Sequence, residues 1–72
     1  LYEQAAQSYE QAQALIESLG SSSPRLAYDI GRMRLLLLQY DKAEKNLWLA
    51  AEQKENTELR TEALKALKML YE

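Results

Sequence analysis

Two arginines and a tyrosine are the residues of this chain best suited to recognising another molecule. Tyr28 and Arg32 follow Arg25 by three and seven residues, a spacing that places all three on one face of a helix. A guanidinium group binds a carboxylate through two parallel hydrogen bonds, so the cluster suits an acidic partner. The alternative is that both arginines are solvated and the tyrosine is half-packed.

The only tryptophan, Trp48, is a second candidate for contact with a partner. It stands between Leu47 and Leu49 on a segment whose inward stripe is formed mainly by alanines, so we expect it to point partly outward. Tryptophan is enriched among the residues that dominate binding energy at interfaces. The alternative is that Trp48 packs against an adjacent helix.

Residues suited to catalysis or metal binding are scarce. The chain has no His and no Cys, which excludes disulfides, zinc ribbons and histidine-based catalysis. Glutamates three or four residues apart do occur, as at Glu52 and Glu55, but such pairs are common on solvated helix faces. No glycine-rich phosphate loop or nucleophile motif is present. We therefore expect no enzymatic activity, no cofactor and no metal.

The composition favours an all-α domain. The 72 residues are 47% hydrophobic and include no Val and no Phe. Their only β-branched residues are Ile16, Ile30, Thr57 and Thr61, whereas strands favour β-branched and aromatic residues. The longest apolar run is formed by leucines 35–38, far short of the ~20 residues that span a bilayer.

The distribution of charge limits the kinds of partner. A net charge of −2 is too balanced for binding to nucleic acid or to anionic membranes through phosphate neutralisation. Residues 1–24 carry three glutamates and no base, giving −3, whereas residues 25–36 carry three arginines and one aspartate, giving +2. This asymmetry either steers an acidic partner towards the chain or reflects ordinary solvated faces.

Two helices are predicted in the first half of the chain, over residues 2–19 and 24–38. The first has one apolar stripe at steps of three and four residues, formed by Tyr2, Ala5, Tyr9, Ala12, Ile16 and Leu19. Gly20 supplies the left-handed residue that ends a helix, and Ser23-Pro24 supplies a cap and a first helical residue. In the second helix one side is formed by Ala27, Ile30, Gly31 and Arg34. The four consecutive leucines cover every direction, so we expect that end to be surrounded by neighbours.

Two more helices are predicted over residues 41–55 and 58–71. Asp41 suits a helix N-terminus, Asn56 suits the left-handed end of a helix and Thr57 suits a cap. The predicted inward residues of the third helix are Ala43, Leu47, Ala50 and Ala51. Those of the fourth are Leu59, Ala63, Ala66, Leu67 and Leu70.

An internal repeat relates the first and third of these helices. Residues 2–5 (YEQA) return as residues 40–43 (YDKA), and Tyr9 corresponds to Leu47, at an offset of 38 residues. Matching from Tyr9 gives an alternative offset of 31, but 38 places Gly20 and Pro24 between the units. Small residues in both units allow helix backbones to approach closely, as antiparallel helix pairs stacked in a row require.

Residues 24–57 resemble one tetratricopeptide repeat, flanked by half repeats. Residues 27–31 (A-x-x-I-G) are similar to the signature of its first helix, and residues 40–50 (Y-x-x-A-x-x-x-L-x-x-A) to that of its second. The sequence departs from the family pattern at three places. Arg34 stands where the family has Tyr, and the other two departures are Leu38-Gln39 in the turn and residues 56–57 at the end of the repeat. Residues 19–27 (L-G-x-x-S-P-x-x-A) are similar to the linker of kinesin-light-chain-type repeats, whose first helix is longer.

The resemblance implies an α-solenoid fragment of antiparallel helix–turn–helix units. Such arrays bind a peptide or protein in the groove lined by the first helix of each repeat. The implied groove residues are Arg25, Tyr28, Arg32, Leu35, Leu36, Glu62 and Met69. Asp29, Glu62 and Ala66 stand at groove positions of this chain, unlike the Lys, Asn and Arg of chaperone-binding members, so we expect no clamp for a terminal carboxylate.

These observations together favour a protein-interaction scaffold whose partner is a protein or peptide. The alternatives are a structural spacer within a longer solenoid and a small homodimerising bundle in a regulatory protein. The broad apolar stripe of the last helix predicts either that the protein continues beyond Glu72 or that the chain self-associates. Because the chain begins with Leu1 rather than Met, we expect a piece of a longer protein, and the lack of Cys is compatible with the cytoplasm, where we place it.

Overall fold

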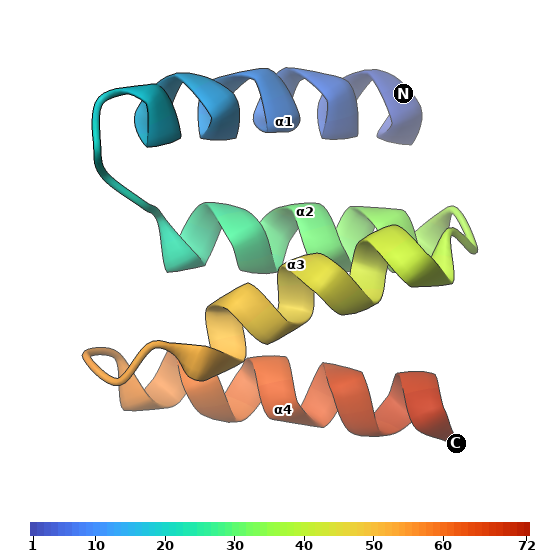
Figure 1. Cartoon of the computed structure of the whole chain (residues 1–72). Coiled ribbons are helices and arrows are strands. Elements are labelled where there is room, and N and C mark those ends of the chain that lie inside the picture. The colour runs from blue at the N-terminus through green and yellow to red at the C-terminus, as the bar shows by residue number, and fades with distance from the viewer.

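The computed structural model describes all 72 residues and consists of four helices without strands (Figure 1). They are α1 (Tyr2–Ser18), α2 (Pro24–Leu36), α3 (Tyr40–Glu52) and α4 (Thr57–Tyr71). The expected all-α fold of about four antiparallel helices is confirmed, although α1, α2 and α3 end one to three residues earlier than predicted. No helix reaches the combination of length and apolar character that crossing a membrane requires.

The C-terminus of α1 and the N-terminus of α2 are capped as the sequence predicted. Gly20 has a φ of +79°, and the amides of Gly20 and Ser21 donate hydrogen bonds back to the last turn of α1, which is the Schellman arrangement. Ser23 Oγ accepts a hydrogen bond from the Leu26 amide at 3.3 Å, and Pro24 is the first residue of α2.

The turn after α2 departs from the predicted boundary. Leu38 has a φ of +60°, and the amides of Leu38 and Gln39 donate to the carbonyls of Leu35 and Arg34. This is the same Schellman closure, with a leucine where glycine is preferred. The chain therefore leaves the helix at Leu36. Because Leu36 and Leu38 are then exposed, the prediction that all four leucines are surrounded by neighbours is wrong.

The break between α3 and α4 differs from the prediction in which residue caps α4. Asn56 Oδ1 accepts a hydrogen bond from the Leu59 amide at 3.0 Å, and Asn56 has an extended φ of −114° rather than a left-handed one. Asn56 is thus the cap of α4, and Thr57 is its first helical residue. α3 similarly begins at Tyr40, one residue before the predicted Asp41.

The helices lie in a row, with α1 and α4 at opposite edges (Figure 1). The backbone of α1 contacts only α2, whereas α3 contacts α2 and α4, and α2 also touches α4. The result is a plate of 35 × 30 × 16 Å rather than a closed bundle in which α1 meets α4. The core cluster lies entirely in α2, α3 and α4, and it consists of Tyr28, Leu47, Ala50, Ala51, Leu59, Ala63, Ala66 and Leu67.

The face that α1 turns towards its neighbours is not its apolar stripe. Tyr2 of that stripe is 58% exposed, and Ala6 is the only buried residue of the helix. The side chains of α1 that bind neighbouring helices are polar, namely those of Glu3, Glu10 and Gln13. The reason is a buried guanidinium group on α2, which requires carboxylates opposite it.

Candidate functional site

The structure brings Arg25, Tyr28 and Arg32 together on one face of α2, as their spacing predicted. The Tyr28 ring is part of the core cluster and is only 8% exposed, so it is buried rather than half-packed. The guanidinium carbons of Arg25 and Arg32 lie 5.9 and 5.8 Å from the ring centroid. Arg32 Nη1 donates a hydrogen bond of 2.8 Å to the Tyr28 hydroxyl. One buried ring therefore positions two guanidinium groups whose arginines are exposed.

A hollow of about 380 Å³ separates Arg25 and Tyr28 from the first turns of α4. Glu58 and Glu62 line its other side. Arg25 Nε is 3.7 Å from Asp29 Oδ1, and exposed pairs of this kind contribute little to stability. The hollow thus has a basic wall on α2 and an acidic wall on α4.

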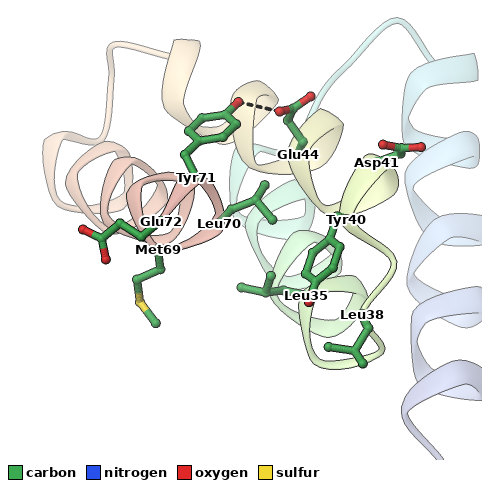
Figure 2. Close-up of a pocket in the computed structure, with 9 residues that line it drawn as sticks. All are labelled: Leu35, Leu38, Tyr40, Asp41, Glu44, Met69, Leu70, Tyr71 and Glu72. Carbon is green, nitrogen blue, oxygen red and sulfur yellow. Dashed lines mark hydrogen bonds between the residues drawn. The ribbon is translucent and has the colours of Figure 1, made fainter.

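The other predicted groove residues lie elsewhere along the two helices. Leu35 and Met69 line a second hollow, of about 600 Å³, at the C-terminal ends of α2 and α4 (Figure 2). Arg32 and Leu36 lie outside both hollows. Five of the seven predicted groove residues therefore line two separate hollows, and the other two line neither.

Trp48 is 40% exposed and is hydrogen-bonded to the last helix. Its Nε1 donates to the Tyr71 hydroxyl at 2.9 Å, and that hydroxyl donates to Glu44 Oε2 at 2.6 Å. The hydrogen bond to the Glu44 carboxylate raises the pKa of Tyr71. These contacts fasten α4 to α3 and agree with the interpretation that Trp48 packs against an adjacent helix. The sequence offered no signal for the role of Tyr71.

A buried arginine joins α1 to α2, and its partners were not foreseen from the sequence. Arg34 is 1% exposed. Its Nη1 donates to both carboxylate oxygens of Glu3, at 3.0 and 3.1 Å, and to Gln39 Oε1 at 2.7 Å. Its Nε and Nη2 donate to the two carboxylate oxygens of Glu10. No buried side-chain nitrogen or oxygen lacks a partner, so this charge is fully compensated.

The pairing of Arg34 with the two glutamates shifts the pKa values of Glu3 and Arg34. The hydrogen bond from Arg34 lowers the pKa of Glu3, and the hydrogen bond to Glu10 raises the pKa of Arg34. The sequence did contain a signal for it. Glu3 and Glu10 stand seven residues apart without any base in residues 1–24, and Arg34 falls on the inward side of the next helix.

No three acidic side chains gather where they could hold a metal ion.

Comparisons with known proteins identify no relatives of this chain. No protein-family model matches the sequence, and neither curated proteins nor solved structures show significant similarity to it. The two hollows and the Arg25–Tyr28–Arg32 cluster are therefore the features that point to a function.

Proposed function

We propose that this chain is a protein-interaction scaffold of the tetratricopeptide type that binds a peptide or protein partner along α2 and α4. The observation that carries the proposal is the Arg25–Tyr28–Arg32 cluster. Both guanidinium groups contact one buried ring, and preorganised groups lose less freedom on binding. Each still has N–H donors available for a bidentate contact with a carboxylate.

Two packing features support the tetratricopeptide assignment. The antiparallel helices form an open row in which α3 lies between α2 and α4. At the Ile30-Gly31 signature the backbone of α2 approaches α3 so closely that a Cβ on Gly31 would lie 2.7 Å from Leu47 Cγ. Ala43, Leu47 and Ala50 of the second signature are fully buried. Close contact through small residues is what stacked helix pairs require.

The expected mode of binding places an acidic side chain of the partner at Arg25 and Arg32. The buried Tyr28 ring lies 5.9 and 5.8 Å from the two guanidinium carbons and so keeps the two groups near each other. Glu58 and Glu62, across the smaller hollow, repel a second acidic group and attract a basic one. The site therefore selects the charge sequence of the partner as well as its overall charge.

The proposal is tested by selecting peptides from a random display library on the purified protein and measuring their affinities by calorimetry. In Arg25→Gln/Arg32→Gln the selected peptides should lose about tenfold or more in affinity, because hydrogen bonds to charged groups are among the strong ones. Arg60→Gln/Lys68→Gln removes the same charge from exposed positions on α4 and should change the affinity little. Equal losses in the two variants, or a library that yields no binder, would contradict the proposal.

A structural spacer is the second candidate function, favoured by the uncovered apolar side chains of α1. Tyr2 and Tyr9 are 58% and 38% exposed, and in a helical solenoid such faces are covered by the neighbouring repeat. Sedimentation of the purified chain tests this alternative. Self-association that rises with concentration and is abolished by Tyr2→Ser/Tyr9→Ser would favour a spacer or a homodimer over a peptide-binding scaffold.

A further inference from the structure

The hollow at the C-terminal ends of α2 and α4 is lined by two stretches of the chain, residues 35–44 and residues 69–72. Leu35 comes from α2, Leu38 from the following turn, Tyr40 from α3, and Met69 and Leu70 from α4 (Figure 2). Its volume of about 600 Å³ lies within the ~300–1,000 Å³ that is usual for ligand-binding clefts. It is therefore large enough to take one or two side chains of a partner.

Several apolar side chains of this hollow are left in solvent. Leu38 and Met69 are each 69% exposed, and Tyr40 is 52% exposed. Leu38 also holds the left-handed φ of +60°, which costs a leucine free energy that a glycine would not lose. Contiguous exposed apolar side chains mark interaction sites in soluble proteins. An exposed leucine in a strained turn points to the same conclusion, since such strain gathers at functional positions.

The charged groups around this hollow all have the same sign. Asp41, Glu44 and Glu72 line it, and no Lys or Arg does. The Glu44 carboxylate accepts a hydrogen bond from the Tyr71 hydroxyl, and no cationic side chain stands beside it in the lining of the hollow. The smaller hollow differs, because there Arg25 faces glutamates. The larger hollow thus attracts cations specifically.

We propose that this hollow binds a polypeptide segment in which an apolar side chain is flanked by Lys or Arg. The apolar side chain lies between Leu35 and Met69, and the basic side chains pair with Asp41, Glu44 and Glu72. The inference rests on the proposed function only in taking a polypeptide as the partner. It concerns a different site from the Arg25–Tyr28–Arg32 cluster and the opposite charge.

The two methionines allow binding to be located by NMR of isotope-labelled methyl groups. The probes are a short amphipathic helical peptide of Leu and Lys, and its counterpart with Glu in place of every Lys. The Leu/Lys peptide should shift the methyl resonance of Met69 and leave that of Met33, which does not line the hollow. The Leu/Glu peptide should bind about tenfold more weakly or not at all.

Neutralising the rim tests the role of charge without changing the shape of the hollow. Asp41→Asn/Glu44→Gln/Glu72→Gln should weaken binding of the Leu/Lys peptide about tenfold at low ionic strength. Glu44→Gln keeps an acceptor for the Tyr71 hydroxyl, so α4 stays attached to α3. Circular dichroism checks that the variant remains folded.

A matched control removes three exposed carboxylates that line neither this hollow nor the smaller one. Glu17→Gln/Glu52→Gln/Glu55→Gln should leave the affinity for the Leu/Lys peptide almost unchanged. The proposal is overturned if neither peptide binds, if both bind equally, if both methionines shift together or if the two triple variants lose affinity equally. It is also overturned if sedimentation shows a dimer that the rim variant dissociates, because the occupant is then a second copy of this chain. Peptides selected on the Arg25 and Arg32 cluster would still support the proposed function.

Discussion

One added methyl group at Gly31 should destabilise the fold, although alanine is the better helix former. A Cβ there lies 2.7 Å from Leu47 Cγ, 2.8 Å from Leu47 Cδ2 and 3.2 Å from the Leu47 amide nitrogen. Leu47 is fully buried, so its side chain cannot turn into solvent. Overpacking of this kind costs ~1–3 kcal/mol, whereas replacing glycine by alanine within a helix stabilises by ~1 kcal/mol. The expected net loss for Gly31→Ala is about 1 kcal/mol.

Thermal unfolding followed by circular dichroism measures this loss. About 1 kcal/mol corresponds to a fall in Tm of ~4–8 °C for a domain of this size. The cause is tested in a Leu47→Ala background, where the clashing side-chain atoms are absent and Gly31→Ala should be neutral or stabilising. Because Leu47→Ala itself costs ~2–5 kcal/mol, both backgrounds are compared in an osmolyte that favours the folded state. A higher Tm for Gly31→Ala alone, or equal losses in both backgrounds, would refute the steric explanation.

Three other changes have expected outcomes. Leu38→Gly should stabilise the protein by about 0.5–1 kcal/mol in urea unfolding, because it removes the strain of a left-handed leucine whose side chain is 69% exposed. Arg34→Met should lower Tm by several degrees at neutral pH. It should also make Tm fall less steeply as the pH is lowered. The pKa of Glu3 is lowered in the folded state from 4.5, so its contribution to stability is present above that value and is lost as pH falls through the folded-state pKa. In an alkaline absorbance titration, the Tyr71 phenol should ionise above its usual pKa of 10.0. That pKa should fall in Glu44→Gln, and the signal should vanish in Tyr71→Phe.

Each of these outcomes has a clear contrary result. A Leu38→Gly protein that is less stable would mean that the leucine side chain contributes more than its backbone strain costs. If the Tm of Arg34→Met falls in acid as steeply as that of the unaltered protein, the ion pairs with α1 add nothing to the stability of the fold. If Glu44→Gln leaves every phenol unchanged, the Tyr71 hydroxyl does not donate to that carboxylate in solution.

Helix positions could be predicted wherever the deciding interactions are local. Gly20, Ser23 and Pro24 act through their own backbone preferences, and the sequence therefore located the end of α1 and the start of α2. The end of α2 could not be found in this way, because the left-handed residue is Leu38 and leucine gives no signal for that conformation. The pairwise closeness of Arg25, Tyr28 and Arg32 followed from helical spacing for the same local reason.

The inward face of α1 depends on a partner distant in sequence, so periodicity alone could not identify it. The apolar stripe containing Tyr2 and Tyr9 has helical spacing, but so does the polar one containing Glu3 and Glu10. The choice between them is made by Arg34, which is buried on α2 and needs both carboxylates. The larger hollow was missed for a related reason, since its lining comes from two stretches of the chain that are distant in sequence.

The row of helices also sets the order in which the chain can fold. Most contacts join helices that are adjacent in sequence, the exceptions being those between α2 and α4 and the Gln13–Asn46 hydrogen bond between α1 and α3. Proteins dominated by local contacts fold within microseconds to milliseconds. The core cluster is confined to α2, α3 and α4, so these helices can assemble while Arg34 is still hydrated. Desolvation of the guanidinium group is then postponed to the docking of α1, where Glu3 and Glu10 meet it. Added salt should therefore slow this last step and leave the assembly of the other three helices unaffected.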